Sequence, residues 1–351
     1  MWAWSCAPLA EIAPMTSRDI VVKTLTFGHP ERIAMTLPAP YPDDICGAVA
    51  TSDPAHPEGD WAQVAGAREE RVDEWGCTWA RLEGFSKGEV ARGSIESWDQ
   101  LDDFEPPDYG LIDRYEGARE YFAAHAGKFM IGHLPGFPFN IARKMRRLEN
   151  FLMDVAAEPQ KVERLLAIAE EQMHHAIRRF AEVGADGVMF PEDWGTQDRL
   201  LVSPATWRRM FKPGFERLCR TAHERGVFVL MHSCGYIREA MDDMIEAGID
   251  CFQFDQPTIY GIERLADEFG GRASFWCPVD IQNTLQKHDA ARIEAEARQM
   301  IERLGAKGGG FIAGYYYGNE AIGLDPKWQD VACRAFVRYG APKGWEAVSR
   351  A

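Results

Sequence analysis

Apolar residues recur at three- and four-residue intervals along several segments of the chain, and each segment ends at a glycine that precedes a short apolar run. Between Val162 and Val183 this spacing predicts an amphipathic helix, because such intervals place apolar side chains on one helix face. Gly184 follows where a helix C-cap is expected, and "DGVMF" then has the composition of a buried strand. The pattern therefore predicts a helix–glycine–strand unit.

The same unit recurs through the second half of the chain. It predicts strands at 187–191, 227–232, 250–254 and 273–277, and one more after Gly308. Three earlier runs bring the count to eight, namely "RIAMTLP" (32–38), "RVDEWGCTW" (71–79) and "KFMIGHLPG" (128–136). Helices that alternate with short apolar strands are typical of a parallel sheet. We therefore expect an α/β fold, a (β/α)8 TIM barrel in one domain over 17–345, after an N-terminal extension at 1–16. The polar segments 41–70 and 81–110 are expected to be long loops over the barrel mouth.

Composition and charge narrow the class of protein. The chain has 351 residues, of which 46% are hydrophobic and 26% charged, and no apolar run approaches the roughly 18–20 residues of a membrane helix. Its net charge of −15 argues against binding to nucleic acid or anionic lipid, which requires a basic surface. The one basic cluster, Arg143–Arg147, is expected to be an exposed helix face. Eight scattered cysteines without CxxC pairs fit free thiols in a reducing cytoplasm.

Polar and aromatic residues follow most of the predicted strands. In barrels of this kind the chemistry gathers at the carboxyl ends of the strands, because the loops there vary without disturbing the packed interior. The residues at these ends are Asp73, Glu74, Trp75, His133, Glu192, Asp193, Trp194, His232, Cys234, Asp255, Gln256, Cys277, Asp280 and Tyr315–Tyr317.

His232 and Cys234 stand two residues apart at the end of the run "VFVLMH". Alternation along a strand sends residues i and i+2 to the same side, so both side chains can face the mouth. Imidazole with thiolate is a ligand pair typical of Zn²⁺, and a third ligand with an open fourth position would make the site catalytic. The alternative is a hydrogen-bonded histidine beside a small packing residue.

Other candidates also have two interpretations. Glu192 and Asp193 fit an acid/base pair or metal ligands, and they equally fit loop caps. Cys277 is either a third ligand or a buried free thiol. Three adjacent tyrosines at 315–317 cannot all face the core, so we expect at least one to line a pocket.

The segment from "GADGVMFPEDWGTQ" through "SPATWRRMFKP" to "MHSCG" resembles the uroporphyrinogen decarboxylase superfamily, in which these motifs recur in the same order. The openings "SRDIVVKTLTFGHPERIAMTLP" and "DEWGCTW" are also similar, so the resemblance runs from about residue 17 to 340. It implies a (β/α)8 barrel. Porphyrinogen decarboxylases of this superfamily carry an Arg-containing "MRQAGR" stretch after the first strand. Because "AMTLPAPYPDD" stands here instead, we expect no porphyrinogen substrate.

The other branch of the superfamily contains cobalamin-dependent methyltransferases and demethylases, which bind Zn²⁺ through an HxC pair and a later cysteine. His232 and Cys234 match the pair. The later cysteine has no match, since "GGGFIAGYYYGNE" carries tyrosines there, so Cys277 or Glu192 is expected to complete the set.

The resemblance therefore implies a zinc-assisted methyltransferase that exchanges a methyl group between a small methylated or methoxylated compound and a corrinoid. No cobalamin-binding module is evident, so the corrinoid is expected on a partner protein. The alternative is a metal-independent decarboxylase or lyase of the same fold, acting on a small carboxylated substrate. The sequence leaves the oligomeric state open, with a homodimer as one option. The expected catalytic residues are Asp193, Asp255 and Tyr316. The expected substrate contacts are Glu74, Trp75, His133, Phe137, Phe139, Trp194 and Tyr315.

Overall fold

The structure is a computed structural model that describes residues 15–82 and 88–341. Eight strands form one sheet, in which all seven pairings of neighbours are parallel. Their order is β1 (Ala34–Met35), β12 (Phe311–Ala313), β11 (Ser274–Cys277), β10 (Cys251–Gln253), β9 (Phe228–His232), β8 (Gly187–Pro191), β7 (Phe129–His133) and β2 (Ile45–Val49).

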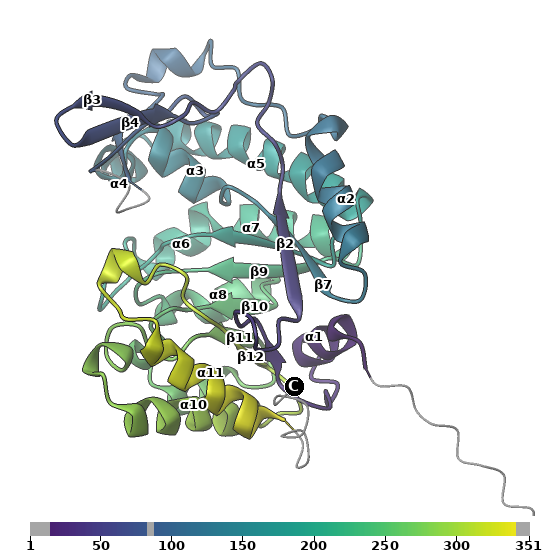
Figure 1. Ribbon diagram of the computed structural model, residues 1–351. Helices are drawn as coiled ribbons and strands as arrows, with labels where there is room; N and C mark the ends of the chain where they lie inside the picture. Colours follow the sequence, from purple (N-terminus) through teal and green to yellow (C-terminus); the bar gives the residue numbers. More distant parts are fainter. Residues whose placement is uncertain (1–14, 83–87, 342–351) are drawn as a thin grey trace, which may run out of the picture.

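The sheet is curled into a half-barrel with helices on its outer side (Figure 1). The helices are α1 (Ser17–Leu25), α2 (Glu116–Ala124), α3 (Pro138–Met145), α4 (Leu148–Ala157), α5 (Pro159–Glu182), α6 (Pro204–Met210), α7 (Lys212–His223), α8 (Arg238–Ala247), α9 (Ile262–Phe269), α10 (Ala290–Leu304) and α11 (Lys327–Gly340). None of the helices in the described ranges is long and apolar enough to cross a membrane.

The two edges of the sheet, β1 and β2, meet around Asp44. The amide of Asp44 donates to the carbonyl of Met35 over 2.8 Å, and its carboxylate accepts two hydrogen bonds from Arg32. No strand ladder joins β1 to β2 within residues 15–82. The predicted α/β class and eight parallel strands are present, and the sheet has the curvature of the predicted barrel.

The second strand was predicted wrongly. Residues 71–79 do not enter the large sheet, because the side chain of Asp73 accepts hydrogen bonds from the amides of Trp75 and Cys77 and closes a turn. The chain therefore reverses there, and β2 takes the second place in the barrel order.

The segments predicted as loops also contain strands. A second, antiparallel sheet is formed by β3 (Ala62–Ala65), β4 (Arg68–Val72), β5 (Thr78–Leu82) and β6 (Glu89–Arg92). It lies beside α3 and α4 at one end of the large sheet (Figure 1). The amide of Ile95 donates to the carbonyl of Met145, which ties the segment after β6 to the end of α3.

The basic cluster Arg143–Arg147 is likewise not an exposed helix face. Arg146 is 8% exposed and donates to the carbonyls of Ile95 and Glu96 and to the carboxylate of Asp154. Only Arg147 of the five residues is exposed. The segment after β6 covers the end of α3, so the side chain of Arg146 lies under it.

Candidate functional site

The loops that follow β8 and β9 lie in direct contact, and two glycines permit this. A Cβ at Gly235 would come within 2.2 Å of the carbonyl oxygen of Gly195, and Gly235 also has a φ of +76°. A Cβ at Gly195 would lie 2.4 Å from the amide nitrogen of Tyr236. No side chain fits at either position, since real Cβ contacts are never so short. The close approach brings the end of one strand against the end of the next.

Three potential ligand groups converge there. The Sγ of Cys234 lies 3.3 Å from Nε2 of His232, and Oδ1 of Asp193 lies 3.7 Å from the same nitrogen. All three ligand atoms lie within 4.8 Å of one another. The amide of Cys234 also donates to Oδ1 of Asp193 over 2.9 Å, so the carboxylate is fixed by the neighbouring loop. We call these residues the Asp193–His232–Cys234 cluster.

The other ring nitrogen of His232 is occupied. Its Nδ1 is hydrogen-bonded to Oε1 of Gln253, whose Nε2 donates to Oδ1 of Asp255 over 2.8 Å. An amide oxygen only accepts, so Nδ1 carries a hydrogen, and Nε2, which faces Cys234 and Asp193, is the nitrogen that takes up either a proton or a metal ion. Gln253 thus selects the tautomer that a metal ligand needs.

The electrostatic environment of His232 favours positive charge. Burial lowers the pKa of its imidazole, but the hydrogen bond with Cys234 and the charges of Asp255, Cys234 and Asp193 outweigh burial and raise the pKa to about 9. A site that stabilises a proton at Nε2 by surrounding it with acidic groups also stabilises a metal cation there.

Comparisons with known proteins agree with this architecture. Residues 88–319, more than half of the chain, match the sequence family described as uroporphyrinogen decarboxylase (URO-D). The chain belongs to the URO-D family. No curated protein sequence matches it.

Solved structures with a similar fold include a methyltransferase from Methanosarcina mazei. It has a TM-score of 0.62 at 14% identity, over 93% of this chain and 100% of that one. A B12-independent methionine synthase from Shewanella sp. W3-18-1 is a weaker match, with a TM-score of 0.44 at 12% identity, over 74% of this chain and 68% of that one. At 14% identity the first likeness establishes a shared fold and nothing more.

The cluster has a composition and geometry that suit Zn²⁺. A histidine nitrogen, a cysteine thiolate and an aspartate oxygen are each ligand types that Zn²⁺ binds, and three protein ligands are typical of a catalytic zinc site. Tetrahedral bonds of about 2.0–2.3 Å place neighbouring ligand atoms roughly 3.3–3.6 Å apart. The observed separations of 3.3 Å and 3.7 Å are close to that range. The residues present therefore fit the ion that the URO-D resemblance implies.

The third member of the cluster differs from the expected one. Cys277 and Glu192 are both completely buried, and neither belongs to the cluster. Strand alternation explains Cys277, because its neighbour Trp276 faces the inside of the sheet, where its Nε1 donates to Oγ1 of Thr36. Cys277 therefore faces the helices, and burial raises the pKa of its thiol above the ordinary value. Asp193 occupies the place beside His232 and Cys234.

Glu192 lies behind the cluster. Its Oε1 accepts a hydrogen bond from the amide of Asn140, and its Oε2 has no partner in the described ranges. Burial raises the pKa of this carboxyl to about 8, against the opposing effects of the Asn140 hydrogen bond and the charge of Arg143. It is a neutral, buried acid near neutral pH.

The tyrosines have three different environments. Burial raises the pKa of Tyr316, and the charges of Asp255 and Cys234 raise it further. Tyr315 accepts a hydrogen bond from Nδ2 of Asn319, and Tyr317 is 72% exposed. Of the three tyrosines, Tyr316 is the one whose pKa responds to charges of the site, and its catalytic role stays a prediction.

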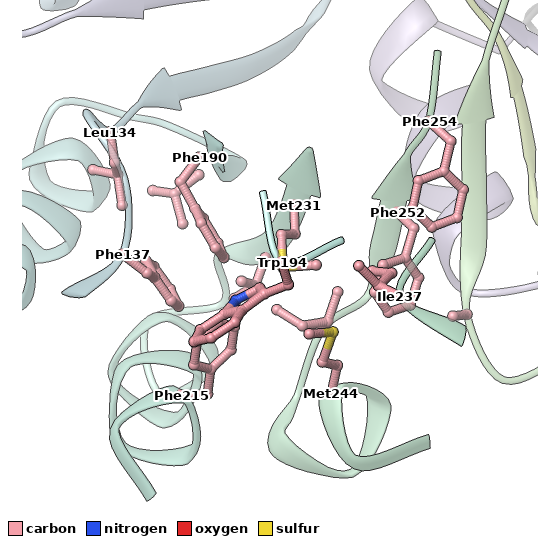
Figure 2. Packing of buried hydrophobic residues seen from close by; sticks show 14 of the residues in the cluster. Leu134, Phe137, Phe190, Trp194, Phe215, Met231, Ile237, Met244, Phe252 and Phe254 are labelled. Carbon is pink, nitrogen blue, oxygen red and sulfur yellow. The ribbon is translucent and has the colours of Figure 1, made fainter. Parts of the chain in front are cut away.

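Three of the expected substrate contacts are core residues. Phe137, Phe139 and Trp194 have no exposed surface. Phe137 stacks on Phe190 at 3.4 Å between ring centroids, and Phe139 stacks on Trp194 at 3.7 Å. Figure 2 shows Phe137, Phe190, Trp194 and Phe215 packed together. The structure gives these rings a packing role in place of the substrate contact suggested by the sequence.

Glu74 and Trp75 lie in a separate network. The carboxylate of Glu74 accepts hydrogen bonds from Tyr109 and from Arg114, the latter over 2.7 Å, and Trp75 stacks on Tyr109. Burial raises the pKa of Glu74 despite these partners. The network joins loops of the region after β2, and substrate contact by these two residues stays a prediction.

His133 ends β7 and faces the inside of the curled sheet. Gly47 on the neighbouring strand makes room for it, because a Cβ there would lie 2.3 Å from Nε2 of His133. Burial lowers the pKa of this imidazole, so it is neutral near pH 7. It is positioned in the interior below the mouth, two strands from β9.

Two residues beside the cluster were missed from the sequence, namely Arg143 and Gln253. Gln253 could have been found, because it lies two residues before Asp255 and therefore faces the same side of its strand. Arg143 was hidden within a basic run whose burial depends on a segment far away in sequence.

Proposed function

We propose that the protein is a methyltransferase that moves a methyl group between a small methylated or methoxylated compound and a corrinoid carried by a partner protein. The observation that carries the proposal is the Asp193–His232–Cys234 cluster at the carboxyl ends of β8 and β9 in a URO-D family chain. The fold likeness to a methyltransferase supports methyl transfer in general. The corrinoid partner rests on the resemblance of the sequence and on the lack of a recognisable cobalamin module.

In this proposal Asp193, His232 and Cys234 hold Zn²⁺, and Gln253 orients the imidazole. A bound Zn²⁺ would lower the pKa of a thiol acceptor, so that it reacts as the thiolate, or would make a methoxy oxygen a better leaving group. Asp255 accepts the Gln253 hydrogen bond through Oδ1, and its Oδ2 has no partner in the described ranges. That oxygen is available to accept a proton from an incoming acceptor.

Tyr316 would have the complementary role. Its raised pKa keeps the phenol protonated near neutral pH, so it can donate a hydrogen bond to a developing oxyanion. His133 and Tyr315 stay proposed substrate contacts. We further propose that residues 17–345 form one domain and that the protein works in the cytoplasm. The seven described cysteines, all free, support that location.

A metal-independent decarboxylase or lyase is the second candidate. It is favoured by the raised pKa of His232, because without a metal this histidine would hold a proton beside Asp193. A protonated imidazole in that position is a general acid.

Metal analysis separates the two candidates. Protein purified without chelators should contain about one zinc per chain, as a three-ligand catalytic site retains its ion. Cys234→Ala and Asp193→Ala should lose most of it, and transfer of methyl groups to or from a free corrinoid should fall in parallel. A zinc-free wild type together with a fully active Cys234→Ala would refute the methyltransferase proposal and favour the lyase.

A further inference from the structure

Two cations of α3, Arg143 and Lys144, have few hydrogen-bond partners, and Arg143 lies beside the cluster. The Nε of Arg143 donates to Oδ1 of Asn140 over 2.9 Å, and its NH2 approaches Oδ2 of Asp193 at 3.4 Å. Its NH1 has no partner in the described ranges. The Nζ of Lys144 makes one long hydrogen bond of 3.4 Å, to the carbonyl of Pro135, and lies 5.4 Å from the ring centroid of Trp79. Both side chains therefore have N–H donors without an acceptor in the described ranges.

Asp193 connects Arg143 on α3 to the cluster. Its Oδ1 lies 3.7 Å from Nε2 of His232, and its Oδ2 faces Arg143. Because carboxyl C–O bonds are only about 1.2–1.3 Å long, the guanidinium lies within roughly 9 Å of Nε2. A small molecule with one end at the cluster therefore reaches Arg143 with its other end.

The geometry of Arg143 suits a carboxylate. A guanidinium binds a carboxylate best through two parallel N–H donors, and the contact with Asp193 uses one donor at long range. Asn140 holds the Nε edge and Asp193 takes one hydrogen of NH2, which leaves NH1 and the second hydrogen of NH2 for a ligand. Asp193 lies next to this edge and would repel a phosphate dianion more strongly than a carboxylate. The side chain of Arg143 is 21% exposed, so it is accessible.

We propose that Arg143 binds a carboxylate of the substrate, so that the methyl donor is a small methylated carboxylic acid, or the methyl acceptor is the corresponding acid without the methyl group. This inference rests on the proposed function. The acid group lies against α3, and the methyl-bearing atom lies at the Asp193–His232–Cys234 cluster. The chain has a net charge of −15, so an arginine beside the cluster whose NH1 has no partner in the described ranges gives the mouth a local preference for an anion.

The test is a binding series with matched neutral compounds. Methoxyacetate, 3-methoxypropanoate and the three methoxybenzoates are titrated calorimetrically into zinc-loaded protein, each beside its own primary amide. At least one acid should bind at least tenfold more tightly than its amide, because only the carboxylate pairs with the guanidinium. Arg143→Gln should remove this preference, and Arg143→Lys should retain part of it.

Arg147→Gln is the matched control, since Arg147 is exposed and pairs with Glu149 away from the cluster. It should bind the acid as the wild type does. Equal binding of acid and amide, or an acid preference that survives Arg143→Gln, overturns the inference. Binding of none of the five acids also overturns it.

Zinc content of each variant distinguishes this failure from failure of the proposed function. An Arg143-dependent acid preference in protein that never holds zinc would leave the carboxylate site standing and remove the methyltransferase proposal. Zinc binding with methyl transfer, but with no acid preference, would leave the methyltransferase proposal standing and remove the carboxylate site.

Discussion

The amide of Cys234 donates a hydrogen bond to Oδ1 of Asp193 over 2.9 Å, and this contact joins the ends of two neighbouring strands. It places a carboxylate beside a histidine and a thiol that come from a different loop. Asp193 and Cys234, which are 41 positions apart in sequence, thus belong to one candidate metal site. The contact depends on backbones that pack without side chains between them.

Gly235→Ala should therefore damage the site through the backbone. The new Cβ would meet the carbonyl of Gly195, and a φ of +76° is strained for alanine. We expect a loss of stability of about 2–4 kcal/mol in urea unfolding and a weaker zinc affinity. Gly226→Ala is the control, since its φ is +69° but its Cβ would meet open space. It should cost only about 1 kcal/mol and leave zinc affinity unchanged. Equal effects of the two substitutions would contradict the proposed loop contact.

Gln253→Leu should weaken metal binding without removing a ligand. The substitution leaves Nδ1 of His232 without its acceptor, so the ring loses its fixed tautomer and orientation. We expect zinc affinity to fall about 10–100-fold, as measured by competition with a chromogenic chelator. Gln253→Glu keeps an acceptor oxygen at this position and should retain most of the affinity. Unchanged binding in Gln253→Leu would show that the amide does not orient the ligand.

Cys277→Ala and Cys234→Ala should have opposite effects. Cys277 is completely buried, so its truncation leaves a small cavity and should cost about 1–2 kcal/mol of stability, with zinc retained. Cys234 is exposed, so its truncation should leave stability nearly unchanged and remove zinc. Denaturant unfolding and elemental analysis of both variants provide the check. Loss of zinc in Cys277→Ala would restore this residue as the third ligand.

The pair His223 and Asp250 predicts a pH dependence of stability. The hydrogen bond to Asp250 raises the pKa of His223, with burial opposing it. Because the folded pKa lies above the unfolded one, the stabilisation is fully present below the unfolded pKa near 6.5 and disappears as the pH rises through the folded pKa. The difference in unfolding free energy between wild type and His223→Gln should thus be larger at pH 5.5 than at pH 9. A difference independent of pH would refute this assignment.

The sequence by itself determined the parallel α/β architecture. The strands β8 to β11 were predicted from the glycine that ends each preceding helix, because a helix cap and an apolar run are local signals. Strand parity also placed His232 and Cys234 on the same side, as the cluster shows. The second strand was predicted at the wrong segment for two reasons. The partial exposure of β2 leaves its sequence without a clear apolar period, and the turn at Asp73 interrupts the segment that was predicted instead.

Only the tertiary structure decided which residues join His232 and Cys234. Cys277 and Asp193 carry equally plausible ligand atoms, and the choice between them depends on the strand face and on the contact between Gly195 and Gly235. The burial of Phe137, Phe139 and Trp194 and the position of Arg143 depend in the same way on distant segments. Local sequence fixes which side of an element a residue occupies. Which other element that side meets is set by packing between segments far apart in the chain.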